Sequence, residues 1–254
     1  MRAAPLGLAC SASHLLRIVC MARLPRLTLP GLPHYVVQRG NNQQAIFVDG
    51  HDYACMKDLL REMGRRFGLD IHAFILLPNQ LQLLATPETA DSLPQFMQSV
   101  GRTYVRTFNN RHSRSGTLWE GRYRATVLEP MAWMLPAMVV LENQAVAHGL
   151  SGRAVDYSWS SARHNAGAQI DGMLRLHPAY WSLGDTPFAR EAAYAALLDR
   201  GATDEVAEVV LNAALKGWVL GSDSFVQGLQ QRTQRRLARQ KAGRPSATAA
   251  EKAE

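Results

Sequence analysis

Residues 71–87 read IHAFILLPNQLQLLATP, and this stretch decides how the fold is interpreted. The apolar run from Ile71 to Leu77 predicts a strand. Pro78-Asn79 is a turn signal, and the residues from Gln80 to Ala85 alternate polar and apolar, the pattern of a half-buried strand. The stretch therefore predicts two strands joined by a short turn.

The sequence around this hairpin predicts further strands and helices. Upstream we expect a strand over residues 34–39, a turn over 40–42 and a helix over 49–68; downstream we expect a helix over 92–108, a strand over 119–128 and a helix over 131–148. Apolar spacing and turn residues set these ranges, and Gly149 is a helix stop. The order β-α-β-β-α-β-α fits a sheet with helices packed on it, so we predict an α+β fold.

After about Tyr157 the pattern changes to helices only, over residues 188–199, 204–215 and 222–239, and no internal repeat is evident. The last helix merges into a basic stretch followed by Ala, Ser and Glu residues, a composition typical of disorder. We expect an N-terminal extension (1–20), an α+β domain (21–150), a helical C-terminal region (151–230) and a basic, disordered tail (231–254).

Composition excludes several protein classes. The chain has 254 residues, a formal net charge of +7 and three cysteines without CxxC spacing, so neither a disulfide framework nor a zinc site is indicated. No apolar run reaches the roughly 18–20 residues that a membrane helix needs. Polar residues interrupt the apolar core that residues 1–20 would need as a secretory signal, and Met21 is the natural start. A soluble, cytoplasmic protein is the expectation.

The positive charge is concentrated rather than spread. Residues 101–124 hold six arginines and one acidic residue, whereas residues 125–228 hold six bases and eleven acids; residues 229–254 are basic again. Aromatic residues such as Trp119 are interleaved with the first arginine block. Bases attract phosphates and aromatic rings stack on nucleobases, which indicates nucleic-acid binding. The alternative is a helix whose arginines are merely solvated.

Gln80 and Gln82 lie two apart on the predicted strand and so point to the same face. Two histidines there would hold a divalent metal, whereas glutamine offers only a neutral carbonyl oxygen. Alternating glutamines are more often a solvent-facing strand edge.

Several long motifs in order resemble the REP-associated tyrosine transposases, a branch of the HUH single-strand transposases. They are MARLPRLTLPGLPHYVVQRGNNQQAIF, IHAFILLPNQLQLLATP, GTLWEGRYRATVLE, SWSSARHN, GWVLGSDSF and the late GRP. The resemblance runs from Met21 to about Pro245. It implies a ferredoxin-like antiparallel sheet with packed helices, a two-histidine metal site and a tyrosine nucleophile on a downstream helix. Such enzymes cut and rejoin single-stranded DNA.

This chain departs from that pattern at each reacting position. Gln80 and Gln82 stand where the family has its histidines. On the downstream helix, Val140 stands at the nucleophile position and Gln144 at the position of an assisting ligand. Tyr104, on another helix, is an alternative nucleophile, although we interpret it as structural or DNA-facing.

The motifs suited to binding are retained. The resemblance and the charge pattern give these candidate DNA-binding residues: Arg39, Asn41, Asn42, Arg102, Arg106, Trp119, Arg122, Arg124, Arg235 and Arg236. We therefore expect a DNA-binding protein for single-stranded or hairpin DNA that does not cut it and needs no cofactor.

Two alternatives remain open. One is an active transposase that uses Mg²⁺ or Mn²⁺ at an altered site made of Gln80, Gln82 and Glu142. The other is a non-functional remnant of a mobile element. The expected partner is DNA, with no membrane; a homodimer is possible, and the sequence does not decide it.

Overall fold

A computed structural model describes residues 26–238. The expected extension over residues 1–20, the start at Met21 and the tail from residue 239 onward lie outside the described residues. Within the part described, no helix is both long and apolar enough to cross a membrane.

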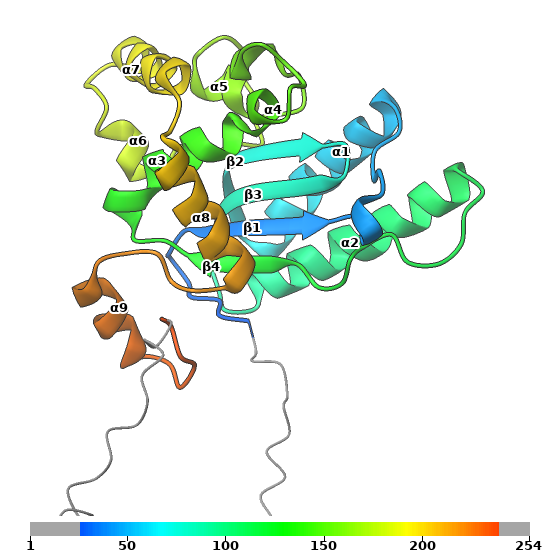
Figure 1. The fold of residues 1–254 in the computed structure, drawn as a ribbon, viewed down its shortest axis with the longest axis horizontal. Helices are drawn as coiled ribbons and strands as arrows, with labels where there is room; N and C mark the ends of the chain where they lie inside the picture. The colour runs from blue at the N-terminus through cyan, green and yellow to red at the C-terminus, as the bar shows by residue number, and fades with distance from the viewer. Residues whose placement is uncertain (1–25, 239–254) are drawn as a thin grey trace, which may run out of the picture.

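The described chain follows the predicted order of elements and adds short helices after the fourth strand (Figure 1). The elements are β1 (His34–Arg39), η1 (Asn41–Gln43), α1 (Gly50–Phe67), β2 (Leu69–Leu77), β3 (Gln80–Pro87), α2 (Ser92–Arg111), β4 (Arg124–Val127), α3 (Pro130–Glu142), α4 (Gln144–Ala147), η2 (Ala154–Asp156), α5 (Ala162–Asn165), α6 (Pro178–Trp181), α7 (Pro187–Arg200), α8 (Asp204–Lys216) and α9 (Asp223–Gln230).

The four strands form one antiparallel sheet in the order β2-β3-β1-β4. Helices α1 and α2 connect β1 to β2 and β3 to β4, which makes a β-α-β-β-α-β unit of the ferredoxin-like kind. The predicted α+β, ferredoxin-like class is therefore confirmed. The predicted 71–87 hairpin is β2 and β3, and its central register pairs Ile75 with Gln82 and Leu77 with Gln80.

Local signals explain where α1 begins and ends. The Asp49 carboxylate accepts hydrogen bonds from the backbone N–H groups of His51 and Asp52, which otherwise lack helical partners. Gly68 ends the helix at φ +61°, a left-handed conformation that glycine adopts without strain.

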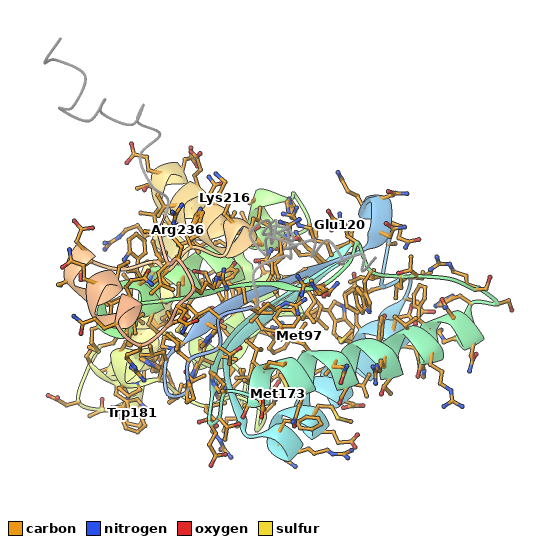
Figure 2. The ribbon with its side chains drawn as sticks, turned by 90° about the horizontal axis from the view of Figure 1, so that it is seen from below. Met97, Glu120, Met173, Trp181, Lys216 and Arg236 are labelled. Atoms are coloured by element: carbon orange, nitrogen blue, oxygen red, sulfur yellow. The ribbon has the colours of Figure 1, made fainter. Side chains whose placement is uncertain are left out.

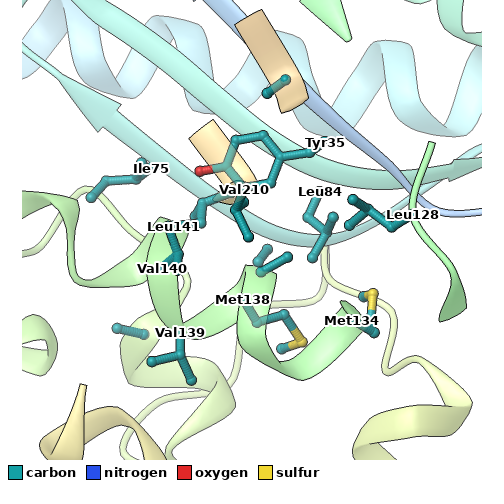
Figure 3. Close-up of a cluster of buried hydrophobic side chains, with 14 of the residues drawn as sticks. Tyr35, Ile75, Leu84, Leu128, Met134, Met138, Val139, Val140, Leu141 and Val210 are labelled. Carbon is teal, nitrogen blue, oxygen red and sulfur yellow. The ribbon is translucent and has the colours of Figure 1, made fainter. Parts of the chain in front are cut away.

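The sheet is covered on both faces (Figures 1 and 3). Helices α1 and α2 pack on one face, where Val36, Phe74 and Leu83 belong to one hydrophobic core. Helices α3 and α8 lie on the other face, where Tyr35 and Val140 belong to a second core that includes residues of α7. The prediction that β3 is half-buried was wrong, because α3 covers the face that would otherwise meet solvent.

Three element boundaries differ from the predictions. The helix expected over 131–148 breaks at Asn143, whose side-chain amide donates to the Val139 and Leu198 carbonyl oxygens. The strand expected over 119–128 is only β4, since residues 117–123 form a loop with Gly121 at φ +142°. The helix expected to reach residue 239 ends at Gln230, whose side chain accepts from the Leu237 N–H.

His34 on β1 is expected to stay neutral well into the acidic range. Its Nε2 accepts from the Leu29 N–H and its Nδ1 donates to the Leu32 carbonyl, so one nitrogen must remain unprotonated. Burial lowers its pKa to about 4. Stability from the neutral ring is complete above pH 6.5 and falls by about 3 kcal/mol as the pH drops through 4. An NMR titration of the His34 ring would test this, and an apparent pKa near 6.5 would contradict it.

Candidate nucleic-acid interface

A cavity of about 730 Å³ lies between α2 and the 117–123 loop, and we call it the α2 groove. Its charged and aromatic lining residues are Arg26, Arg102, Arg106, Arg122, Trp119 and Tyr123. No acidic side chain is among the described residues that line it. The groove therefore combines positive charge with rings, which is the chemistry of a nucleic-acid surface.

Helix α2 serves both the core and the groove. Arg102 and Arg106 are one helical turn apart, so they lie on the same side of α2. Tyr104 and Phe108 are buried in the core below them. Across the groove, Trp119 is held in place by its indole N–H, which donates to the Gly101 carbonyl oxygen at 3.3 Å. The groove is therefore built from fixed elements on both sides.

The arginines of residues 101–124 differ in whether acidic side chains neutralise their charge. Arg111 forms ion pairs with Asp49 and Asp52 at the start of α1, so its charge is locally neutralised. By contrast, no ion pair found among residues 26–238 involves Arg102, Arg106 or Arg122. Acidic residues distant in sequence thus pair with Arg111, whereas no ion pair of the described residues neutralises Arg102, Arg106 or Arg122.

Three of the predicted DNA-binding arginines lie away from the α2 groove. Arg124 donates to the Leu215 carbonyl oxygen at the end of α8, on the opposite face of the sheet. Arg235 is partly buried and donates to the Gly217 carbonyl oxygen at 2.8 Å, and burial lowers its pKa. Arg236 is exposed, and Figure 2 shows it well away from Met97, which lines the groove. The structure therefore does not bring these residues to the same surface.

On the other side of the 117–123 loop lies a second cavity, of about 490 Å³, which we call the polar pocket. It is lined by Arg39, Asn42, Gln43, Asn79, Gln80, Glu120 and His148. Arg39, Asn42 and Gln80 were predicted as site residues, whereas the other four were missed. Asn41 is not among the lining residues; its N–H donates to the Leu118 carbonyl oxygen and ties the loop to η1.

The two glutamines of β3 are not solvent-facing. Gln82 is 2% exposed, and its Oε1 accepts a hydrogen bond from the Tyr35 hydroxyl at 2.5 Å. The Gln80 amide nitrogen lies 3.4 Å from the His148 Nε2. The interpretation of these residues as an exposed strand edge was wrong, because α3 and α4 cover this face.

Val140 and Gln144, the two positions predicted to correspond to the family's nucleophile and assisting ligand, lie on either side of the helix break at Asn143. Val140 is 2% exposed and packs in the core beside the sheet (Figure 3). The Gln144 amide donates to the Val140 carbonyl oxygen at 3.2 Å.

These residues do not fit a divalent metal. The Gln82 oxygen already accepts from Tyr35, and Gln80 and Gln144 are neutral amides engaged with neighbours. Glu142 does not join them, since its carboxylate accepts from Ser161, Asn165 and Tyr194. Among the residues described, no cluster of three or more His, Cys, Asp or Glu side chains is suited to a metal. The altered site of Gln80, Gln82 and Glu142 is therefore not formed.

Tyr104 is poorly placed to act as a nucleophile. It is 1% exposed, and its hydroxyl donates to the Ile46 carbonyl oxygen. Burial also raises the pKa of the hydroxyl far above its ordinary value. The structural interpretation of Tyr104 agrees with this geometry, whereas a DNA-facing position does not.

Comparison with known proteins gives structural likenesses only. No family model matches the chain, and no curated protein matches its sequence. The chain is similar to a solved REP-associated tyrosine transposase bound to a REP hairpin, at 14% identity and TM-score 0.48, over 63% of this chain and 93% of that one. It is also similar to a candidate transposase from Deinococcus radiodurans R1, at 18% identity and TM-score 0.33, over 50% of this chain and 97% of the other.

Proposed function

We propose that the protein binds hairpin or single-stranded DNA through the α2 groove and does not cut it. The observation that carries this proposal is the groove's lining of four arginines and two aromatic side chains, with no acidic side chain among the lining residues that the structure describes. Phosphate contacts by arginine supply affinity by releasing counterions. Trp119, which lines the groove and is partly exposed, provides a ring on which an unpaired base stacks.

Binding is tested by fluorescence anisotropy with a labelled DNA hairpin and a random single strand of equal length. Three or four phosphate contacts predict that log K falls with log salt at a slope of roughly −3. Tighter binding of the hairpin supports selective recognition. Equal affinity for both strands would leave only charge-driven binding, and no binding of either would favour a non-functional remnant.

We further propose that the chain lacks strand-cleaving activity. Valine at position 140 has no oxygen or sulfur with which to attack a phosphate, and the neutral amides beside it do not replace a metal site. DNA binding through the groove needs no metal.

We expect no nicked or covalently linked product when the protein is incubated with hairpin DNA and Mg²⁺ or Mn²⁺. Denaturing gels with end-labelled DNA would measure this, and Tyr104→Phe is the matched variant. Cleavage by the natural protein that is lost in Tyr104→Phe would overturn the proposal and make Tyr104 the nucleophile.

A further inference from the structure

Helix α7 presents an apolar face on the outside of the molecule. Its inward side chains Tyr194 and Leu198 are buried in the core, whereas Phe188, near its start, is 81% exposed. Ala192 and Ala196 follow Phe188 at intervals of four residues, so they lie on the same side of the helix, and both are exposed. The solvent side of a surface helix is normally polar, so this face has the character of a contact surface.

The apolar surface continues in the segment before α7. Leu176 and Trp181 are 37% and 57% exposed, and α6, which ends at Trp181, contacts α7. Of the eight large hydrophobic side chains that are exposed among residues 26–238, three therefore fall within residues 176–188. Figure 2 shows Trp181 at the periphery of the molecule. Exposed apolar side chains that gather in this way mark surfaces that bind another protein.

The exposed face of α7 is held in a fixed position. The Thr186 hydroxyl oxygen accepts from the Ala189 N–H at 3.1 Å and caps the start of the helix. On the inward side, the Tyr194 hydroxyl donates to the buried Glu142 carboxylate at 2.8 Å. A surface that is already rigid loses little conformational freedom when it binds, so α7 is preorganised for contact with a partner.

Exposed charges of opposite sign mark the two ends of this face. Asp185 comes just before the start of α7, and Arg200 is its last residue. Both are exposed, and neither takes part in an ion pair found within residues 26–238. Asp199, the exposed acid beside Arg200, is already paired with Arg153 at 3.2 Å. The start of the face is thus negative and its end positive, so the two ends are complementary to each other.

We propose that two copies of this chain associate through α7, packed antiparallel about a two-fold axis near Ala192. In this arrangement Phe188 of each copy lies over Ala196 of the other, where the small side chain leaves room for the ring, and Asp185 lies near Arg200 of the other copy. Because the face is complementary to itself in both shape and charge, a second copy of the chain is the partner that it fits.

This inference goes beyond DNA binding and does not depend on it. Helix α7 belongs to the core on the opposite face of the sheet from α2, so pairing through α7 leaves the α2 groove open (Figure 1). One helix pair with flanking rings is a small interface, for which we expect a dissociation constant of roughly 1–100 μM. The DNA titrations, run at nanomolar protein, therefore measure the monomer.

The first test is sedimentation velocity of the full chain without DNA, from about 1 to 500 μM. The average mass should rise from that of one chain toward that of two, and Phe188→Glu should weaken association roughly 10-fold or more, since it places a charge at the centre of the contact. Val48→Glu is the matched control, because Val48 is an apolar side chain that is 62% exposed and lies between η1 and α1. It should associate like the natural protein.

Three results would overturn the inference. A natural protein that stays monomeric at 500 μM would assign the face to a partner other than this chain. Phe188→Glu that associates as well as the natural protein would exclude α7 from the contact. An equal loss in Val48→Glu would show association through scattered apolar side chains. Thermal melting checks that the variants fold, which the exposure of both side chains favours.

The second test is a charge reversal that separates the antiparallel arrangement from any other. Two-fold symmetry makes the Asp185–Arg200 contact twice, so Asp185→Arg or Arg200→Asp alone should weaken association roughly 3- to 10-fold. The double variant should return to within about twofold of the natural protein, because it restores opposite charges with the signs exchanged. Single variants without effect, or a double variant that does not recover, would overturn the antiparallel pairing.

Discussion

A variant with both Arg102 and Arg106 replaced by alanine is expected to bind hairpin DNA roughly 10- to 100-fold more weakly at about 0.1 M salt. Both side chains line the α2 groove, and neither forms an ion pair within the described chain that would hold it elsewhere. The salt dependence should change as well, because each lost phosphate contact reduces the slope of log K against log salt by about 1. Anisotropy titrations at several salt concentrations measure both quantities.

The matched control is Arg163→Ala with Arg200→Ala, which removes the same charge from exposed positions outside the groove. This control should change affinity by less than about threefold, since net charge alone acts weakly through screened solvent. If the control weakens binding as much as the groove variant, the protein binds DNA by overall charge and the groove has no special role. Unchanged folding of both variants, measured by thermal melting, completes the comparison.

The second large effect is expected at Glu142, the fully buried carboxylate that joins α3 to the C-terminal helices. Asn165 and Tyr194 donate to it at 2.7 and 2.8 Å, and Ser161 donates to it as well. Glu142→Ala leaves three buried donors without their acceptor and opens a cavity. We expect it to lower the free energy of unfolding by about 3–5 kcal/mol. Urea denaturation measures the loss.

Glu62→Ala is the control for this variant, because Glu62 is an exposed carboxylate in the middle of α1. Its effect should stay within about 0.5 kcal/mol. A loss of less than about 1 kcal/mol in Glu142→Ala would show that the three donors find other partners, and the proposed anchoring role of Glu142 would be wrong.

Glu142 should also give the protein a characteristic pH dependence. Burial raises its pKa to about 7. The folded state then holds a proton that the unfolded state releases above about pH 4.5, so this contribution to stability is complete at low pH and falls by about 3 kcal/mol as the pH rises to about 7. His34 acts in the opposite direction over much of the same range. The pH dependence of the natural protein's stability therefore does not separate the contribution of Glu142 from that of His34.

Comparing the free energies of unfolding of the natural protein and Glu142→Gln separates the contribution of Glu142. Between pH 4.5 and 7.5, this variant should gain up to about 3 kcal/mol relative to the natural protein, since it has no proton to lose. A constant difference across this range would show that the pKa of Glu142 is not raised.

The sequence predicted the arrangement of the sheet because its signals are local. Apolar spacing and turn residues act within a few residues, and they placed β1, α1, β2 and β3 within two residues of their ends. The burial of β3 was not predictable in this way. It depends on α3 and α8, which pack on the sheet from far along the chain.

The candidate site was predicted in part for the same reason. Arg102 and Arg106 were predicted from the local cluster of positive charge, and both line the α2 groove. The pairing of Arg111 with Asp49, and the proximity of Gln80 to His148, join residues about 60–70 positions apart. Glu120, the one acidic residue within residues 101–124, was not predicted as a site residue, and it lines the polar pocket.

The 117–123 loop runs beside the end of β1 as a short antiparallel pair, with Gly40 opposite Trp119. Consecutive residues in such a pair point to opposite sides, so Gln38 and Trp119 line the groove while Arg39 and Glu120 line the pocket. Inserting a single residue before Trp119, with the pairing to β1 kept, would move the ring to the pocket side and the carboxylate to the groove side. The length of this loop therefore determines which side chains line each of the two cavities. A change in loop length would alter both cavities at once, even if every lining residue were retained.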